Sequence, residues 1–183
     1  MRAVKIIGVF GISGVGKSRL VSEVAERVPG CLHLQGSALI RQGLSDPSVS
    51  LEELRCSSSD RIIANQRILT VMFARAVSKH IGSLVLFDGH LVIDTGPELI
   101  EVPRTIIAAL QPAILVHVEA KPSLIVTYRQ TDESKKRPAR DIDTLAAQQT
   151  RSRNLCQACA HGQSIPMLIV RSGDVDGLAA LCQ

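Results

Sequence analysis

The chain has 183 residues, of which 45% are hydrophobic and 2% aromatic, and its formal net charge is +4. This length suits one domain, expected over residues 1–183, with an aliphatic core. The mild charge and scarce aromatic residues argue against nucleic-acid binding, and no apolar run approaches the roughly 20 residues of a membrane span. Because the apolar start is too short for a secretion signal, we expect a soluble, cytoplasmic protein.

The first element is an apolar run, Val4–Phe10, followed by a glycine-rich loop and a helical pattern. Its β-branched residues predict a strand buried on both faces of a sheet. The loop Gly11–Ser18 matches the P-loop pattern G-x-x-x-x-G-K-[ST] at every fixed position. Apolar residues then recur at helical spacing until Pro29-Gly30 ends the run.

This pattern predicts a site for the triphosphate of ATP. Glycines let backbone N–H groups surround phosphates, the lysine reaches the β- and γ-phosphates, and the hydroxyl holds Mg²⁺. The expected ATP contacts are Gly11, Ser13, Gly14, Val15, Gly16, Lys17 and Ser18, and Ser18 is also an expected magnesium ligand. The alternative is a glycine-rich turn that binds nothing, which the flanking strand and helix disfavour.

The second expected strand, Cys31–Leu34, leads into a polar stretch at residues 35–56 that contains Gly43 and Pro47. Polar segments of this length in a compact domain often bind ligands, so we expect the acceptor-binding region here. The longest expected helix follows over Ser58–Ile81, where apolar residues share one face and a serine cluster provides a cap.

The third expected strand, Ser83–Phe87, leads directly into Asp88-Gly89-His90. Ligands of open α/β sheets lie beyond the carboxyl ends of strands, so Asp88 is an expected magnesium-side acid and catalytic residue. The alternative for Asp88 is a plain turn residue. For His90 two interpretations stay open: it contacts the acceptor substrate, or it caps the loop.

The fourth expected strand, Ala113–Val118, precedes a charged segment at residues 131–143 that we interpret as a lid. Four basic residues lie within six positions here: Lys135, Lys136, Arg137 and Arg140. The alternative is a solvated basic loop that binds nothing. Because the segment lies between two helical patterns in a P-loop protein, we favour a phosphate-facing lid in which Asp141 orients an arginine.

The C-terminal part adds a helical segment and a fifth strand, Met167–Val170. The helical segment carries Cys156-x-x-Cys159 without a second ligand pair, so ordinary thiols are favoured over zinc or redox use. Five strands alternating with helices predict a three-layer α/β/α P-loop fold with a central parallel five-stranded sheet.

Together these features favour a small-molecule kinase. Phosphoryl transfer needs two substrates held in line, charge neutralised on the transferring group, and water excluded. Lys17, Asp88, Arg137 and Arg140 are the expected catalytic residues.

The chain also resembles the nucleoside monophosphate kinases, and most of all the archaeal-type adenylate kinases. Gly11-Ile-Ser-Gly-Val-Gly-Lys is similar to their GxPGVGK-like loop, with Ser13 in place of proline. Asp88-Gly-His90 matches their Asp-x-His, and Arg137-Pro-Ala-Arg140-Asp141 resembles their lid element with one more residue between the arginines. Smaller matches are Gln35-Gly36-Ser37, Leu54-Arg55, Gln66, and the pair Gln149 and Arg153.

This resemblance implies roles for further residues. Arg55 would grip the phosphate of the monophosphate near Gly36, Gln66 would read its base, and His90 belongs to the same substrate-binding set. Arg129 would join the lid arginines around the transferring phosphoryl group. The alternatives without a functional role are that Arg55 is a surface arginine, Gln66 a solvated helix residue, and Arg129 part of a charge pair at a helix end. The archaeal resemblance also implies a homo-oligomer.

The sequence therefore predicts a kinase that uses ATP and Mg²⁺ on a nucleoside monophosphate, with AMP favoured. One alternative is a kinase acting on another small metabolite, for which Asp88 would serve as base towards a hydroxyl. The other is an ATP-hydrolysing switch or assembly factor. A regulatory GTPase is disfavoured because the sequence lacks an N-K-x-D segment.

Overall fold

The computed structural model describes residues 4–44, 48–55, 58–132 and 137–183, without the side chains of residues 51 and 55. A central sheet has the strand order β2-β3-β1-β6-β7, and every neighbouring pair is parallel. Its strands are β1 (Lys5–Phe10), β2 (Cys31–Gln35), β3 (Leu84–Gly89), β6 (Ile114–Glu119) and β7 (Met167–Arg171). All five coincide with the strands expected from the sequence, which confirms the predicted parallel sheet.

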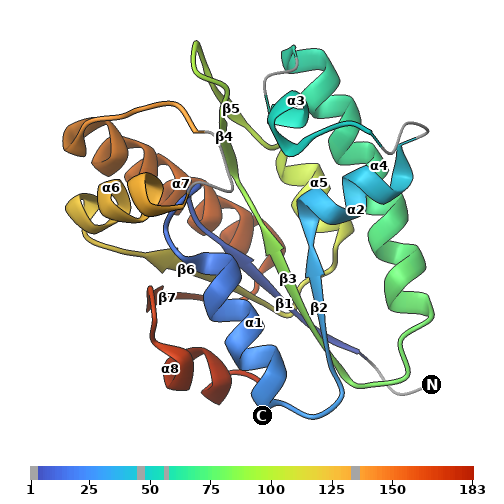
Figure 1. Ribbon diagram of the computed structural model, residues 1–183. Helices are drawn as coiled ribbons and strands as arrows, with labels where there is room; N and C mark the ends of the chain where they lie inside the picture. Colours follow the sequence, from blue (N-terminus) through green and yellow to red (C-terminus); the bar gives the residue numbers. More distant parts are fainter. Residues whose placement is uncertain (1–3, 45–47, 56–57, 133–136) are drawn as a thin grey trace.

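Helices cover both faces of this sheet and complete three layers (Figure 1). The first is α1 (Lys17–Arg27), which packs beside the C-terminal α8 (Val175–Ala180) on one face. The other face packs against α2 (Gly36–Gly43), α4 (Ser59–Ser78), α5 (Arg104–Ala109) and much of α7 (Ile142–Gln163). The remaining helices are α3 (Leu51–Arg55) and α6 (Pro122–Thr131).

The period-two alternation of strand β1 divides the core in two. Ile7 and Val9 belong to the cluster under α1, whereas Ile6 and Phe10 belong to the cluster under α4. Because each face of the strand is covered, β1 reads as a continuous apolar run in the sequence. Burial on both faces fixes the register of the central strands, and hence the place where the loops at their carboxyl ends emerge.

Helix α4 matches the longest helix expected from the sequence. Its N-cap is Ser58, whose hydroxyl accepts a hydrogen bond from the backbone N–H of Arg61 at 3.4 Å. Ile62, Leu69 and Phe73 are buried along one face of the helix. The apolar period and the serine cap together account for its start and its orientation.

The polar stretch after β2 is more regular than the sequence indicated, since α2 and α3 occupy much of residues 35–56. A hairpin of β4 (Val92–Asp94) and β5 (Leu99–Glu101) was not expected from the sequence; it follows β3 and stands at the top of Figure 1. Its strands have only three residues each, too few to give a clear alternation.

The two cysteines of the C-x-x-C pattern, Cys156 and Cys159, are free thiols buried on α7. Burial raises the pKa of Cys156 to about 12 and also raises that of Cys159. In the described ranges, no group of three or more His, Cys, Asp or Glu residues could hold a metal ion, and no helix is long and apolar enough to cross a membrane.

Candidate active site

The loop between β1 and α1 has the conformation of a phosphate cradle. Gly14 and Gly16 both have φ of +88°, in the left-handed region that glycine adopts without strain. A Cβ added at Gly16 would lie 2.5 Å from Ser172 Oγ, so the chain also passes too closely there for a side chain. Helix α1 starts at Lys17 and directs its unpaired N-terminal N–H groups at the loop, an arrangement that binds anions.

Lys17 and Asp88 form a buried ion pair at this loop. Lys17 Nζ donates a hydrogen bond to Asp88 Oδ1 at 2.5 Å, and the two side chains are only 3% and 2% exposed. Burial raises the pKa of the Asp88 carboxyl, but the Lys17 ammonium and the neighbouring His33 and Ser18 side chains outweigh burial. The pKa of Asp88 therefore lies well below its usual range.

The second oxygen of Asp88 suits a cation or its bound water. Asp88 Oδ2 is buried and has no hydrogen-bond partner in the described part of the chain. Ser18, whose hydroxyl accepts a bond from Gln35 Nε2 at 3.3 Å, lines the same cavity as Asp88. Mg²⁺ is typically held by one or two protein oxygens together with phosphates and waters, so Ser18 and Asp88 fit that ion.

Two arginines lie over the P-loop. Arg129 donates through Nε and Nη2 to the backbone carbonyl of Ser13 at 2.9 and 2.8 Å. Arg137 donates from Nε to Ser13 Oγ at 3.2 Å and from Nη2 to Asp132 Oδ2 at 2.6 Å. Its Nη1 is buried without a partner among the described residues, so one donor remains for a ligand.

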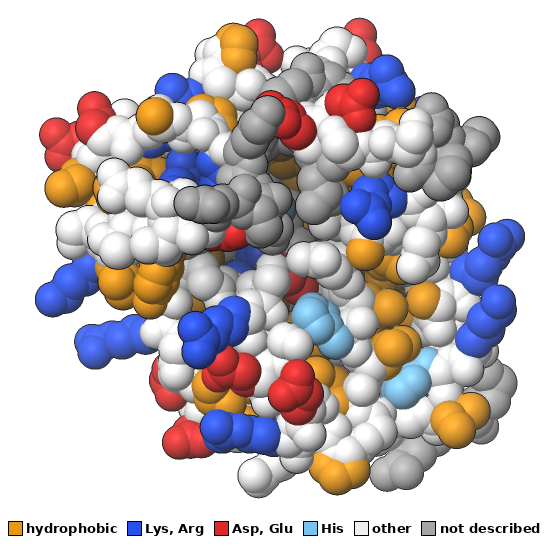
Figure 2. All heavy atoms as spheres, in the orientation of Figure 1, with side chains coloured by type: hydrophobic (Ala, Val, Ile, Leu, Met, Phe, Trp, Pro, Cys, Tyr) orange, Lys and Arg blue, Asp and Glu red, His pale blue; other side chains and the backbone are white. Residues whose placement is uncertain are grey.

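Two cavities meet at this point. One of about 600 Å³ lies along the P-loop, and the other of about 550 Å³ extends over α2 and α4 towards the β4–β5 hairpin. Five residues line both: Ile12, Ser13, Ser18, His90 and Arg137. Figure 2 shows the surface hollowed between the part that carries α6 and α7 and the part that carries α2 to α4. The arrangement can therefore hold two ligands that meet over the P-loop.

Comparison with known proteins agrees with this geometry. The sequence of residues 10–146, which contains the P-loop and both arginines, matches the family described as "AAA domain". The chain belongs to this family. Figure 1 shows that the matched part of this AAA domain runs from the end of β1 to the start of α7.

Relatives of this AAA domain include two adenylate kinases, from Saccharolobus islandicus (strain M.14.25) and Saccharolobus solfataricus. Each is 28% identical, and each match covers 93% of this chain and 93% of the relative. A solved shikimate kinase from Acinetobacter baumannii, in complex with shikimate, has the same fold, with a TM-score of 0.60, 18% identity, and coverage of 99% and 92% of the two chains. The AAA domain described here is accordingly a phosphotransferase with a P-loop kinase fold.

Most of the site residues predicted from the sequence gather at the two cavities. The cavity over α2 and α4, called the acceptor-side cavity because it includes part of the predicted acceptor-binding region, is lined by Gly36, Gln66, Asp88, His90, Arg129 and Arg137 among others. The cavity along the P-loop, called the phosphate-side cavity, is lined by the loop from Ser13 to Ser18. His90 Nδ1 donates to the carbonyl of Gly11 at 2.9 Å, which ties β3 to the P-loop. The side chain of Arg55, and residues 133–136 of the predicted lid, lie outside the described residues.

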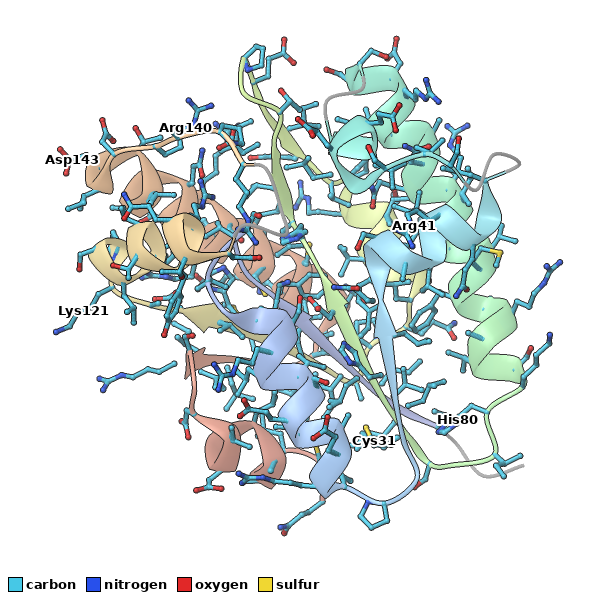
Figure 3. The ribbon with its side chains drawn as sticks, viewed as in Figure 1. Cys31, Arg41, His80, Lys121, Arg140 and Asp143 are labelled. Atoms are coloured by element: carbon cyan, nitrogen blue, oxygen red, sulfur yellow. The ribbon has the colours of Figure 1, made fainter. Side chains whose placement is uncertain are left out.

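Arg140 lies elsewhere than the prediction placed it. Instead of lining either cavity, its guanidinium donates from Nε and Nη2 to the two carboxylate oxygens of Asp94 at 3.1 and 2.9 Å, and also to the carbonyl of Gly96. Figure 3 shows Arg140 on the segment that leads into α7. The neighbouring Asp141, expected to orient an arginine, accepts a bond from Thr144 N and caps α7. The catalytic role of Arg140 stays a prediction.

Several polar residues that line the acceptor-side cavity were not singled out by the sequence reasoning. Among them are Arg41 on α2 (labelled in Figure 3), which lies within the predicted region 35–56, Asn65 on α4, Asp94 on β4 and Gln148 on α7. Gln148 donates to Asp94 Oδ2 at 2.9 Å. Asn65 and Gln148 had a signal in the sequence, because each is a polar residue on the buried side of a helix. Arg41 and Asp94 lie in short elements that give no such signal.

Proposed function

We propose that this protein transfers the γ-phosphoryl group of ATP to a nucleoside monophosphate, with AMP as the preferred acceptor. The observation that carries the proposal is the meeting of the two cavities at Ser13, Ser18 and Arg137. A nucleotide-driven switch needs one ligand site, whereas phosphoryl transfer needs two sites whose reacting groups face each other. The adenylate kinases among the relatives support the choice of acceptor.

On the donor side, the P-loop residues from Gly11 to Ser18 would bind the triphosphate. Backbone N–H groups would surround the phosphates and Lys17 would neutralise the β- and γ-phosphates. Ser18 and Asp88 would hold Mg²⁺, which supplies charge neutralisation across the phosphates when bound. Arg129 and Arg137 would stabilise charge on the transferring group, because both lie against Ser13.

On the acceptor side, the cavity over α2 and α4 would bind the monophosphate. It places the buried amides of Asn65 and Gln66 among apolar side chains such as Ile62 and Leu69, which suits a flat base with polar edges. Gly36 and His90 would lie near the phosphate end. Arg55 is the last residue of α3 and follows Leu54, which lines this cavity; by the family resemblance, Arg55 would contact the acceptor phosphate.

An anionic acceptor also fits the state of Asp88 better than a hydroxyl acceptor does. A hydroxyl needs a base to receive its proton, and a useful base has a pKa near the working pH. In the nucleotide-free protein Asp88 is buried and paired with Lys17, and its pKa lies well below the usual range of a carboxyl. A phosphate acceptor is already an anion and needs no base, so the arrangement favours a monophosphate over a metabolite hydroxyl.

The test is a panel of acceptors. With ATP and Mg²⁺ present, ADP release is measured with AMP, CMP, GMP and UMP, with shikimate as a hydroxyl acceptor, and with water alone. AMP should accelerate ADP release far above the water rate. If shikimate alone accelerated ADP release, the proposed acceptor would change from a nucleoside monophosphate to a metabolite hydroxyl. If no compound accelerated ADP release, an ATP-hydrolysing switch would be the better-supported function.

The archaeal resemblance is also the basis for proposing a homo-oligomer. Light scattering on the purified full chain measures this directly. A mass of one chain at working concentration would rule it out.

A further inference from the structure

Two buried polar atoms without partners face each other beside the P-loop. They are Asp88 Oδ2 on β3 and His33 Nε2 on β2, and they lie 3.9 Å apart. Strands β2 and β3 are adjacent, and Gln35 is the register partner of Asp88. His33 lies two residues before Gln35 on the same strand, so the side chains of His33, Gln35 and Asp88 all project from one face of the sheet.

The chemistry of these atoms defines their relation. A carboxylate oxygen only accepts hydrogen bonds, so a histidine nitrogen facing it is favourable only when that nitrogen carries a hydrogen. The 3.9 Å separation is longer than a hydrogen bond and short enough that a small side-chain rotation makes one. His33 Nε2 is therefore a potential hydrogen-bond donor to Asp88 that makes no such bond in this structure.

The present partner of Asp88 has another task. Lys17 Nζ, bonded to Asp88 Oδ1, is the group expected to move to the phosphates when a triphosphate binds. That movement removes both the counter-charge and the hydrogen-bond donor of a carboxylate that is 2% exposed, and a buried charge left without a partner is strongly unfavourable. Mg²⁺ bound with the triphosphate would replace the charge, but another N–H donor is needed to fix the orientation of the carboxylate.

The other neighbour cannot take over as readily. Gln35 Nε2 already donates to Ser18 Oγ at 3.3 Å, and Ser18 is needed by the bound cation. His33 Nε2 has no competing bond in the described part of the chain.

We propose that His33 is a positioning residue: it donates a hydrogen bond to Asp88 Oδ2 when Lys17 leaves for the phosphates. The proposal rests on the ATP-binding half of the proposed function and is independent of the acceptor. Lys17 holds Asp88 in the nucleotide-free protein, and His33 holds it in the nucleotide-bound protein. The bond would use one lone pair of Oδ2 and leave Oδ1, together with the second lone pair of Oδ2, for the cation or its bound water on the side where Ser18 lies.

The first experiment measures ATP binding by calorimetry, with and without Mg²⁺, for His33→Leu and His33→Gln. His33→Leu removes the donor and should weaken binding of ATP with Mg²⁺ about tenfold, with a smaller change when Mg²⁺ is absent. His33→Gln keeps an N–H donor and should recover most of that loss. His161→Leu, at an exposed position on α7, is the matched control and should bind as the unaltered protein does.

Steady-state kinetics adds a readout that a packing defect would not give. With the acceptor identified by the panel, His33→Leu should lower kcat with little change in the KM of the acceptor, because the expected task of Asp88 is to hold the Mg²⁺ of the donor and not to contact the acceptor. Equal losses in the KM values of both substrates would point to general distortion of the site and overturn the proposal.

The second experiment needs no nucleotide and stands even if the protein proves to bind none. Urea unfolding is compared for His33→Leu in the natural background and in a Lys17→Met background. Because His33 is the remaining partner of Asp88 once Lys17 is gone, His33→Leu should shift the unfolding midpoint more in the Lys17→Met background. Equal shifts in both backgrounds would show that His33 and Asp88 do not interact, and so overturn the proposal.

Discussion

Two aspartates of this protein each hold a cation beside the acceptor-side cavity, and they do so in opposite ways. Asp88 on β3 holds Lys17 through one oxygen and leaves its other oxygen without a partner among the described residues. Asp94 on β4 holds Arg140 with both oxygens, and each oxygen accepts a second bond, from Gly96 N or from Gln148 Nε2. The first pair is incompletely satisfied, and the second is saturated.

This difference indicates that the Lys17–Asp88 ion pair can break when a ligand binds, whereas the Arg140–Asp94 ion pair stays formed. Lys17 has an alternative ligand in the phosphates of ATP, and Asp88 has alternatives in His33 and a cation, so their bond can break at modest cost. If Arg140 left Asp94, a carboxylate that is 6% exposed would keep two neutral donors among the described residues, Gly96 N and Gln148 Nε2. We therefore expect the Lys17–Asp88 pair to serve transfer, and the Arg140–Asp94 pair to fix the segment before α7 to the β4–β5 hairpin.

The largest expected effect is at Lys17. Lys17→Ala should lower kcat/KM by about a thousandfold or more, roughly 4 kcal/mol of transition-state stabilisation, because it removes the cation at the transferring phosphate. Coupled measurement of ADP release checks this. Arg27→Ala removes a cation from the same helix at an exposed position outside both cavities and controls for charge. If Lys17→Ala kept a tenth of the activity, the Lys17–Asp88 pair would not have the role in phosphoryl transfer that we assign to it.

Arg137→Ala should have the next largest effect on transfer. Its guanidinium contacts Ser13, its side chain is only 7% exposed, and its Nη1 has no partner in the described part of the chain. We expect kcat to fall about a hundredfold, or roughly 3 kcal/mol, with a much smaller loss of ATP affinity. Kinetics and calorimetry on the same preparation separate the two quantities. Equal losses in both would show that Arg137 binds the donor and takes no special part in transfer.

Arg140→Ala should affect stability more than chemistry. It leaves Asp94 without its cation at a cavity wall, and because Arg140 is 26% exposed we expect a loss of about 1–2 kcal/mol in the free energy of unfolding. Urea unfolding measures the loss, and kcat should fall less than tenfold. A larger fall in kcat than Arg137→Ala gives would restore Arg140 as a lid arginine that reaches the phosphates.

These two ion pairs also show which parts of the fold and of the candidate site could be predicted from the sequence. Asp88 was found because it directly follows an apolar run that predicts a strand, and ligands of open α/β sheets lie beyond the carboxyl ends of strands. The structure adds that this strand, β3, runs beside β1, which brings Asp88 next to Lys17. Five apolar runs likewise predicted the five strands. All of this information is local, or follows from the rule that parallel strands end at one edge.

Asp94 escaped the sequence reasoning, and with it the partner of Arg140. The two residues are 46 positions apart, and Asp94 lies in a strand of three residues that has no periodicity to detect. Which cation an aspartate holds depends on the tertiary packing of β4 against α7, which no spacing in the sequence encodes. For the same reason the sequence reasoning assigned both Arg137 and Arg140 to the phosphates, whereas in this structure Arg137 contacts Ser13 of the P-loop and Arg140 contacts Asp94.

The smallest expected effect is a change with pH. Burial raises the pKa of Asp94, but hydrogen bonds from Arg140, Gln148 and the backbone of Gly96 outweigh it, so the pKa in the folded state lies below the unfolded value of about 3.9. A lowered folded pKa stabilises the protein above the unfolded pKa, and that contribution disappears as pH falls through the folded pKa. The stability advantage over Asp94→Asn should therefore be constant near neutral pH and shrink below about pH 4.

Urea unfolding of both proteins between pH 3 and pH 7 measures this difference, with Asp176→Asn as a control that removes the same charge from an exposed side chain. An advantage that stayed constant down to pH 3 would mean that Asp94 owes its stabilising effect to neutral packing. The Arg140–Asp94 pair would then not stabilise the fold electrostatically, and the proposed difference between it and the Lys17–Asp88 pair would fail.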